Sequence, residues 1–283
     1  MSAPAALTRP ALADALHTPR YEVIPLDGIA DKVIAHVPTD IKLTVTASPA
    51  KGLDATLALA ETLLAAGYAV VPHISARLVR DRAHLDEVLD RLAGVREIFC
   101  IAGDAHAPAG AYAGAAALLE AMGDRRAQFE AIGISGYPES HHVIPDEETI
   151  AAMFAKEPFA THIISQICFD ASVTTRWIRD VRERGTQLPI WIGIPGSVDR
   201  QRLLRVSLKV GLGESVRFLH GHRDWFRRLA LHRRYSPTKL LNQLAPALAD
   251  PYANVAGLHV YTFNEVEQTE RWRRQLLDRL GAR

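Results

Sequence analysis

The stretch from residue 161 to residue 197, THIISQICFDASVTTRWIRDVRERGTQLPIWIGIPGS, contains one complete unit of the pattern that decides the fold. Its two apolar runs, His162–Ile167 and Ile190–Ile194, are apolar on both faces, as is typical of parallel strands covered on both sides. Between them, Ala171–Arg184 has the pattern of a helix, and Gly185 follows it where a left-handed helix end is favourable. The stretch therefore predicts a strand, a helix and a second, parallel strand.

The same alternation extends along the whole chain. The other strands are predicted at Tyr21–Leu26, Ile41–Thr46, Ala69–His73, Glu97–Ala102, Ala131–Ser135 and Gly257–Thr262. The other helices are predicted at Leu53–Ala66, Ala83–Leu92, Tyr112–Met122, Asp146–Lys156, Asp199–Val210, Pro237–Ala249 and Val266–Leu280. Eight strands alternating with eight helices favour a closed (β/α)8 TIM barrel, an α/β fold, over an open doubly wound sheet. We expect residues 20–283 to form this single domain and residues 1–19 to form an N-terminal arm, either mobile or a short helix.

Composition limits the classes of partner. The 283 residues carry 33 basic and 32 acidic side chains, so the net charge of +1 gives no reason to expect nucleic acid. No run approaches the roughly 20 apolar residues that span a bilayer, and the N-terminus has no secretory pattern. Cys100 and Cys168 lie in apolar runs, which favours buried thiols in a reducing compartment. We therefore expect a cytoplasmic protein that does not associate with a membrane.

Polar and glycine-rich motifs follow the predicted strands, where the active sites of such barrels lie. They are YEVIPLDG, LTVTAS, VPHISAR, CIAGDA, ISGYPESHH, ISQICFD, IGIPGS and LHVYTFN. From about Tyr21 to Leu280 the chain resembles the methylenetetrahydrofolate reductase family, in its short prokaryotic type with only a catalytic barrel. The strongest matches are GYPESH, ISQICFD and LHVYTFN. The resemblance implies hydride transfer from NADH or NADPH, through FAD, to methylenetetrahydrofolate, which gives methyltetrahydrofolate for one-carbon metabolism and methionine biosynthesis.

The resemblance also implies roles for individual residues. Glu22 would be the general acid that protonates the departing folate nitrogen, because burial can raise the pKa of a carboxyl group enough. Asp104 would lie between flavin and folate as a second catalytic residue, and Gln166, Phe169 and Tyr261 would bind the substrate. Each residue type also has a structural interpretation: Glu22 could pair with an arginine, Asp104 could cap the next turn or helix, Gln166 could bond backbone and Phe169 could be core.

The implied cofactor-binding residues share positions at or just after strand ends. They are Thr46, His73, Gly103, Asp104, Tyr112, Tyr137 and His141. Gly103 allows a close backbone approach, and Tyr112 is placed at the start of a helix whose amides could meet a phosphate. As isolated residues, the two histidines would more often be structural than functional.

The chain also departs from the family pattern. Ala102 replaces an arginine that helps to hold the flavin, AHAPAGAY replaces a Pro-rich loop, and His142 stands where proline is usual. A flavin-independent, NADH-dependent reductase of the same reaction is therefore an alternative. A tetrahydrofolate-dependent methyltransferase or demethylase on the same barrel is another, and a binding protein that has lost catalysis is a third.

A basic segment at residues 213–235 separates the last two strands. It could be a solvated cationic helix, or a lid that meets the folate's glutamyl tail or a cofactor phosphate. It could also be a subunit contact anchored by Trp225 and Phe226, so a homo-oligomer is possible. Its histidines match no zinc spacing, and we predict no metal.

Overall fold

The strands close into a parallel barrel in a computed structural model that describes residues 5–139, 146–199 and 234–282. Around the barrel the order is β1-β10-β7-β6-β5-β4-β3-β2. The bounds are β1 Arg20–Val23, β2 Lys42–Val45, β3 Val70–Ser75, β4 Glu97–Ile101, β5 Ala131–Gly136, β6 His162–Ser165, β7 Ile190–Pro195 and β10 Val255–Tyr261. Every predicted strand is present, and the predicted fold class, a (β/α)8 barrel, is confirmed.

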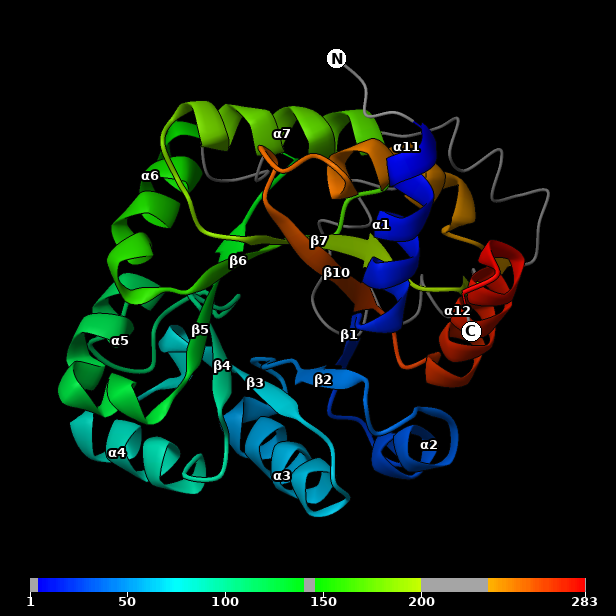
Figure 1. Cartoon of the computed structure of the whole chain (residues 1–283). Coiled ribbons are helices and arrows are strands. Elements are labelled where there is room, and N and C mark those ends of the chain that lie inside the picture. Colours follow the sequence, from blue (N-terminus) through cyan, green and yellow to red (C-terminus); the bar gives the residue numbers. More distant parts are fainter. Residues whose placement is uncertain (1–4, 140–145, 200–233, 283) are drawn as a thin grey trace.

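Helices surround the barrel on its outer side (Figure 1). The α-helices are α1 Ala5–His17, α2 Ile29–His36, α3 Gly52–Ala65, α4 Arg82–Arg91, α5 Ala115–Met122, α6 Asp146–Lys156, α7 Ala171–Glu183, α11 Thr238–Leu248 and α12 Val266–Leu280. Short 3-10 helices occur at η1 Ala76–Leu78, η2 Gly123–Gln128 and η3 Glu157–Phe159. The apolar sides of strands and helices meet in one large core, in which Cys100 is buried, and Cys168 is buried nearby.

Three features differ from the expected helices. Helix α2 follows β1 and was not predicted, because it has eight residues and buries only Ile29 and Val33, too few to set a clear period. Helix α5 begins at Ala115, so Tyr112 precedes the helix instead of opening it. Asp199 belongs to the short strand β8 (Val198–Asp199), which pairs antiparallel with β9 (Arg234–Tyr235).

Two other predictions fall largely outside the described residues. The rest of the helix predicted at Asp199–Val210 lies there, as does the basic segment up to residue 233. The three interpretations of that segment therefore stay predictions. Within the N-terminal arm the structure contains helix α1, which buries Leu12 and Leu16 and packs against α11, α12 and β10.

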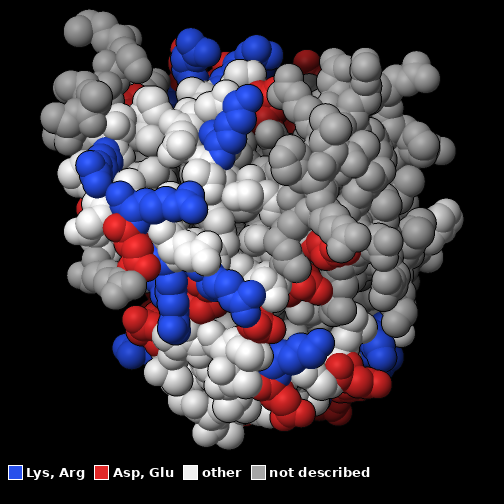
Figure 2. All heavy atoms as spheres, turned by 90° about the vertical axis from the view of Figure 1, so that its right-hand side faces the viewer, with Lys and Arg blue, Asp and Glu red and all other residues white. Residues whose placement is uncertain are grey.

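The outer surface carries both signs of charge. Figure 2 views the molecule from the right-hand side of Figure 1. Basic and acidic side chains are interspersed over the lower part of this face. On α12, which lies on that side, Arg271 Nη2 donates to Glu267 Oε1 over 2.6 Å. Among the described residues, no helix has the length and apolar character needed to cross a bilayer.

A largely buried set of charges lies at the amino ends of the strands, with Lys42 partly exposed. Arg20 and Lys42 both donate to Glu97, Lys42 over 2.6 Å, and Arg20 Nη1 lies 2.9 Å from Nε2 of His162. The Arg20 guanidinium also lies over the Trp191 ring, 3.8 Å from its centroid. We call Arg20, Lys42, Glu97 and His162 the floor cluster. Above it Val71, Phe99 and Ile164 form a small apolar layer, and the remaining inward positions lie toward the carboxyl ends.

Candidate active site

Glu22 lies inside the barrel between two histidines. Its Oε2 is 3.1 Å from Nε2 of His259 on the neighbouring strand β10. The same oxygen is 3.8 Å from Nε2 of His73 on β3. The Glu22 side chain is only 12% exposed, and those of His73 and His259 are 5% and 0% exposed. The alternative that Glu22 pairs with an arginine is thus not what the structure contains. We call Glu22, His73 and His259 the acid cluster.

Burial controls the protonation of the acid cluster. It raises the pKa of Glu22 from 4.5 to about 7, although the nearby His73 opposes this shift. Burial lowers the pKa of His73 to about 4 and that of His259 to about 3. Near neutral pH both histidines are therefore uncharged, and Glu22 holds its proton about half of the time. This is the protonation state that a general acid needs.

Aromatic rings pack around the acid cluster. His73 and Phe99 meet edge to face with centroids 4.7 Å apart, and His259 and Tyr261 do so at 4.9 Å. The Tyr261 hydroxyl donates to the Ser165 carbonyl over 3.2 Å. Burial, and next the neighbouring Glu22, raise the pKa of Tyr261 well above its usual range. The predicted substrate residue Tyr261 is thus beside the predicted acid.

Several buried polar atoms here have no hydrogen-bond partner within the described part of the chain. They are Oγ1 of Thr44, Oγ1 of Thr46, Nε2 of His73 and Nδ1 of His259. Unpaired buried polar atoms cost free energy, and in native structures they often mark places where a ligand or water bonds. Thr44 lies in β2 and Thr46 directly follows it, and residues two apart in a strand share a face. Thr44 is the register partner of Glu22. The cluster therefore has hydrogen-bonding capacity left for a bound molecule.

The sequence interpretation missed Thr44, Phe99 and His259. A signal for His259 was present, because it lies two residues before Tyr261 and alternate strand residues share a face. The same argument places Thr44 with Thr46. Phe99 carried no such signal, since an aromatic residue in an apolar strand looks like core.

Asp104 and Gly103 lie in the loop after β4. Gly103 has φ +89°, and a Cβ atom there would lie 1.8 Å from Oγ of Ser75, so both conformation and space require glycine. Asp104 is exposed, and no helix begins at it, which excludes a helix-capping role. Its charge acts on Tyr137, whose pKa is raised first by burial and further by Asp104, while a Ser135 hydrogen bond opposes the shift. Asp104 is thus close enough to Tyr137 to influence its pKa.

Lys156 is a buried cation that the sequence interpretation did not single out. Its Nζ donates to Oγ of Ser135 over 3.3 Å. Burial lowers the pKa of Lys156 to about 8. Because Ser135 also bonds Tyr137, a polar chain runs from Asp104 through Tyr137 and Ser135 to the end of α6.

Gln166 and Phe169 follow β6. Gln166 is exposed, its amide oxygen accepts the backbone N–H of Ile167 over 2.9 Å, and its own N–H donates to Gly136. The Gln166 side chain thus bonds backbone, as the structural alternative held, but at the surface and not in the core. Phe169 is half-buried and meets the Tyr235 ring edge to face, with centroids 5.7 Å apart.

The described structure does not bring all the predicted cofactor residues to the acid cluster, because Gly103 and Asp104 lie in the loop after β4. Tyr112 packs against the hydrophobic core and lies close enough to Arg82 of α4 to influence its pKa. His141 lies outside the described residues. His73, in contrast, lies beside Glu22, and Thr46 lies two residues after Thr44, the β2 residue that pairs with Glu22.

The loop after β4 is held by Arg77 of η1. Arg77 Nη1 donates to the Ala105 carbonyl over 3.1 Å, and Nε donates to the Ala113 carbonyl over 3.0 Å. The backbone N–H of Arg77 donates to Ala102, and its carbonyl accepts from Ala109. Arg77 is therefore engaged with backbone carbonyls, next to the position where the family's arginine is replaced by Ala102.

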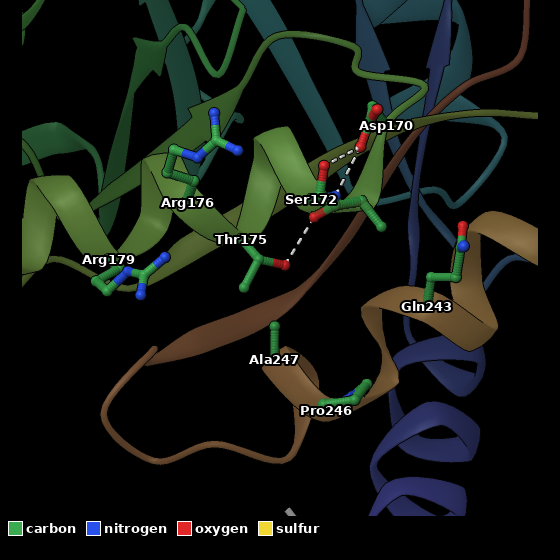
Figure 3. Close-up of a pocket in the computed structure, with 9 residues that line it drawn as sticks. Asp170, Ser172, Thr175, Arg176, Arg179, Gln243, Pro246 and Ala247 are labelled. Carbon is green, nitrogen blue, oxygen red and sulfur yellow. Dashed lines mark hydrogen bonds between the residues drawn. The ribbon is translucent and has the colours of Figure 1, made fainter. Parts of the chain in front are cut away.

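A separate hollow of about 680 Å³ lies between α7 and α11, outside the strand barrel (Figure 3). Arg176, Arg179 and Gln243 line it, with Asp170 at its edge. Asp170 is the N-cap of α7 and accepts the N–H of Ser172 over 2.7 Å. None of the predicted site residues lines this hollow, so it is distinct from the acid cluster.

Comparisons with known proteins found one matching family model and several similar solved structures. A family model described as methylenetetrahydrofolate reductase matches residues 26–211. Dihydropteroate synthase from Thermus thermophilus is similar at 13% identity, with 94% of each chain covered and a TM-score of 0.42. Orotidine 5'-monophosphate decarboxylase from Sulfolobus solfataricus is similar at 9% identity, over 63% of this chain and 77% of that one, with a TM-score of 0.38. Structural likenesses this weak carry no argument.

The match to the family model, in contrast, covers most of the chain. It spans 186 of the 283 residues and includes the motifs that contain Thr46, His73, Asp104, Tyr137 and Gln166. Glu22 and Tyr261 lie outside the matched range, but the closed barrel brings both to the carboxyl half of its interior. The chain belongs to the methylenetetrahydrofolate reductase family.

Proposed function

We propose that this protein reduces methylenetetrahydrofolate to methyltetrahydrofolate, with NADH or NADPH as the source of hydride. Family membership supports a folate-related reductase, an oxidoreductase that acts on methylenetetrahydrofolate. The observation that carries the proposal is Glu22, a buried carboxyl group whose pKa of about 7 lets it hold a proton near neutral pH. Reduction of the methylene carbon requires the five-membered ring to open, and the departing nitrogen requires a proton.

Glu22 is the proton donor in this proposal. One of its oxygens, Oε2, is engaged with His259, which leaves Oε1 for the substrate. Low exposure keeps bulk water from competing for the proton, and a general acid of this kind contributes roughly 10²–10⁴-fold to the rate. After the transfer, the Glu22 carboxylate is stabilised by His259 and His73 until it is protonated again.

The other residues bind and orient. In this proposal Asp104 and Tyr137 bond the polar edge of a pterin. The Gln166 amide exchanges its Ile167 contact for the substrate, since an amide both donates and accepts. Tyr261 packs beside the acid and supports the substrate ring. Phe169 contributes apolar surface after β6.

The residues present fit a flavin in part. Oγ1 of Thr46 and Nε2 of His73 are buried and unpaired within the described residues, which supports a bound polar ring there. Thr46, His73, Gly103, Asp104 and Tyr137 would hold FAD. When bound, FAD supplies a carrier that accepts hydride from the nicotinamide and passes it to the folate.

A flavin-independent reductase of the same reaction is the second candidate. Ala102 offers no charge to a cofactor diphosphate, and the neighbouring Arg77 is engaged with Ala105 and Ala113. Tyr112 lies beside Arg82 instead of at a helix start. These observations favour direct transfer from the nicotinamide in a site that keeps the same proton donor.

The test is to incubate the purified chain with NADH or NADPH and methylenetetrahydrofolate and to quantify methyltetrahydrofolate. Formation of this product with matching oxidation of the nicotinamide supports the proposal. Methyl transfer to or from tetrahydrofolate without nicotinamide oxidation would instead support the methyltransferase or demethylase alternative. The visible absorption spectrum separates the two cofactor routes, because bound FAD absorbs in the visible and a flavin-free protein does not.

Folate and a nicotinamide are the small-molecule partners of this proposal. A cytoplasmic location and a homo-oligomer stay predictions from the sequence.

A further inference from the structure

His259 lies between the floor cluster and Glu22. It is fully buried in β10, its Nε2 lies 3.1 Å from Glu22 Oε2, and its register partner on β1 is Arg20. Both Nδ1 of His259 and Nε of Arg20 are without a hydrogen-bond partner in the described residues. The imidazole therefore has one engaged nitrogen, on the side of the acid.

Burial and the nearby charges keep the His259 ring neutral. Burial comes first among the causes that lower its pKa, and the positive charge of Arg20 comes next, so the ring is neutral. A neutral imidazole carries one N–H. A buried N–H without an acceptor is rarer than a bare acceptor, and in the described residues only Nε2 has an acceptor, Oε2 of Glu22. The N–H therefore belongs on Nε2, where it donates to Glu22.

We propose that His259 is a positioning residue: its Nε2–H donates to Oε2 of Glu22 and so presents Oε1, with the acid proton, to the substrate. This inference rests on the proposed reductase function for its kinetic consequence. Its structural part, the tautomer of His259 and its bond to Glu22, does not depend on which reaction the protein catalyses.

The other groups around Glu22 do not supply this bond. His73 is 3.8 Å away, beyond hydrogen-bond distance, and its Nε2 is unpaired among the described residues. The charge of Glu22 helps to raise the pKa of Tyr261, but the Tyr261 hydroxyl donates to the Ser165 carbonyl and not to Glu22. The groups that face His259 from below are Arg20, His162 and Glu97, and of these only Glu97 favours a charged ring.

Kinetics of two variants test the positioning role. His259→Gln retains an N–H donor near the position of Nε2, whereas His259→Leu removes it. We expect His259→Gln to stay within about threefold of wild type and His259→Leu to lower kcat about 10²-fold with little change in KM for the folate. Because a donated hydrogen bond favours the carboxylate, its loss should move the alkaline limb of the pH profile to higher pH.

The matched control is His84→Gln. His84 is a buried histidine on α4 whose Nδ1 accepts the Arg80 N–H over 3.1 Å and whose backbone N–H donates to Asp81, so these bonds do not involve the acid cluster. Its pH profile should equal that of wild type. Equal losses in His259→Gln and His259→Leu, or an unmoved alkaline limb in His259→Leu, would overturn the positioning role.

Nitrogen NMR of the protein labelled with ¹⁵N-histidine tests the tautomer without any turnover. The signal lost in His259→Gln identifies His259, and we expect it to show a protonated Nε2 and a bare Nδ1 at neutral pH. A proton on Nδ1, or a charged ring, would overturn the inference. If the tautomer is as expected but no methyltetrahydrofolate forms in wild type, then the proposed function fails and the structural part stands.

Discussion

Glu22 on β1 and His73 on β3 approach to 3.8 Å although β2 lies between their strands. This contact is possible because both side chains point into a closed barrel, where inward positions of non-adjacent strands converge. It places a carboxyl group among neutral rings in the interior. The protonation of Glu22 is therefore coupled to the stability of the fold as well as to chemistry.

Glu22→Gln should become relatively more stable than wild type as pH rises. The pKa of Glu22 is raised from 4.5 to about 7 in the folded protein. Below about pH 4.5 the Glu22 carboxyl is protonated in both the folded and the unfolded protein, so its burial carries no ionisation penalty. As pH rises from there through about 7, ionisation favours the unfolded state and wild type loses stability. Urea unfolding at pH 4.5 and pH 8 should show the difference between variant and wild type growing by on the order of 3 kcal/mol. A difference that is constant with pH would contradict the raised pKa.

Glu97→Gln should destabilise the barrel strongly. Burial alone would raise the pKa of Glu97, but the His162 hydrogen bond and the Arg20 and Lys42 charges outweigh it and lower the pKa to about 2. Removing the charge leaves the buried Arg20 uncompensated, and an unpaired buried charge typically costs about 3–5 kcal/mol. Lys42 also loses its partner, but it is partly exposed and contributes less. Thermal and urea unfolding at pH 7 measure this loss.

The pH dependence and a control sharpen this second prediction. The stabilisation by Glu97 is present above about pH 4.5 and is lost as pH falls toward 2, so the variant and wild type should converge in acid. Glu130→Gln breaks an exposed pair with Arg96 and should leave the unfolding midpoint unchanged. Similar effects of Glu97→Gln and Glu130→Gln would refute the role given to the floor cluster.

Gly103→Ala should impair both folding and turnover. At φ +89° a Cβ atom is strained, and it would also overlap Oγ of Ser75. We expect a loss of roughly 1–3 kcal/mol in unfolding free energy from backbone strain, together with a displaced Asp104. Combining Gly103→Ala with Ser75→Gly removes the overlap but not the strain, so the double variant should recover only part of the stability. Full stability of Gly103→Ala alone would disprove the steric requirement.

Much of the fold could be predicted from the sequence. The eight strands are apolar runs with clear boundaries, and their observed starts and ends fall within three residues of the predicted ones, the largest difference being the end of β1 at Val23 instead of Leu26. Helix α2 was missed because eight residues give one buried pair and no repeating period. Closure of the barrel could be predicted from the number of strands alone, without knowing how neighbouring strands are aligned.

The candidate site was predictable at the level of motifs but not of contacts. Glu22, Asp104 and Gln166 are predicted at strand ends around one cavity. The structure places Glu22 inside the barrel beside Tyr261, whereas Asp104 and Gln166 are exposed in the loops after β4 and β6. The partner of Glu22 could not be predicted, because His259 reaches it only through the register of β1 with β10. Tyr112 was placed wrongly at a helix start, since the helix α5 begins three residues later and a glycine, Gly114, is its N-cap.

The central claim, that Glu22 donates the proton for folate reduction, is tested most directly by methyltetrahydrofolate formation in Glu22→Gln. The amide keeps the size of the side chain but cannot donate an acidic proton, so the rate should fall by roughly 10²–10⁴-fold. The exposed change Glu120→Gln on α5 should have no effect. If FAD is bound, its reduction by the nicotinamide should continue in Glu22→Gln. Folate turnover by Glu22→Gln at the wild-type rate would contradict the account.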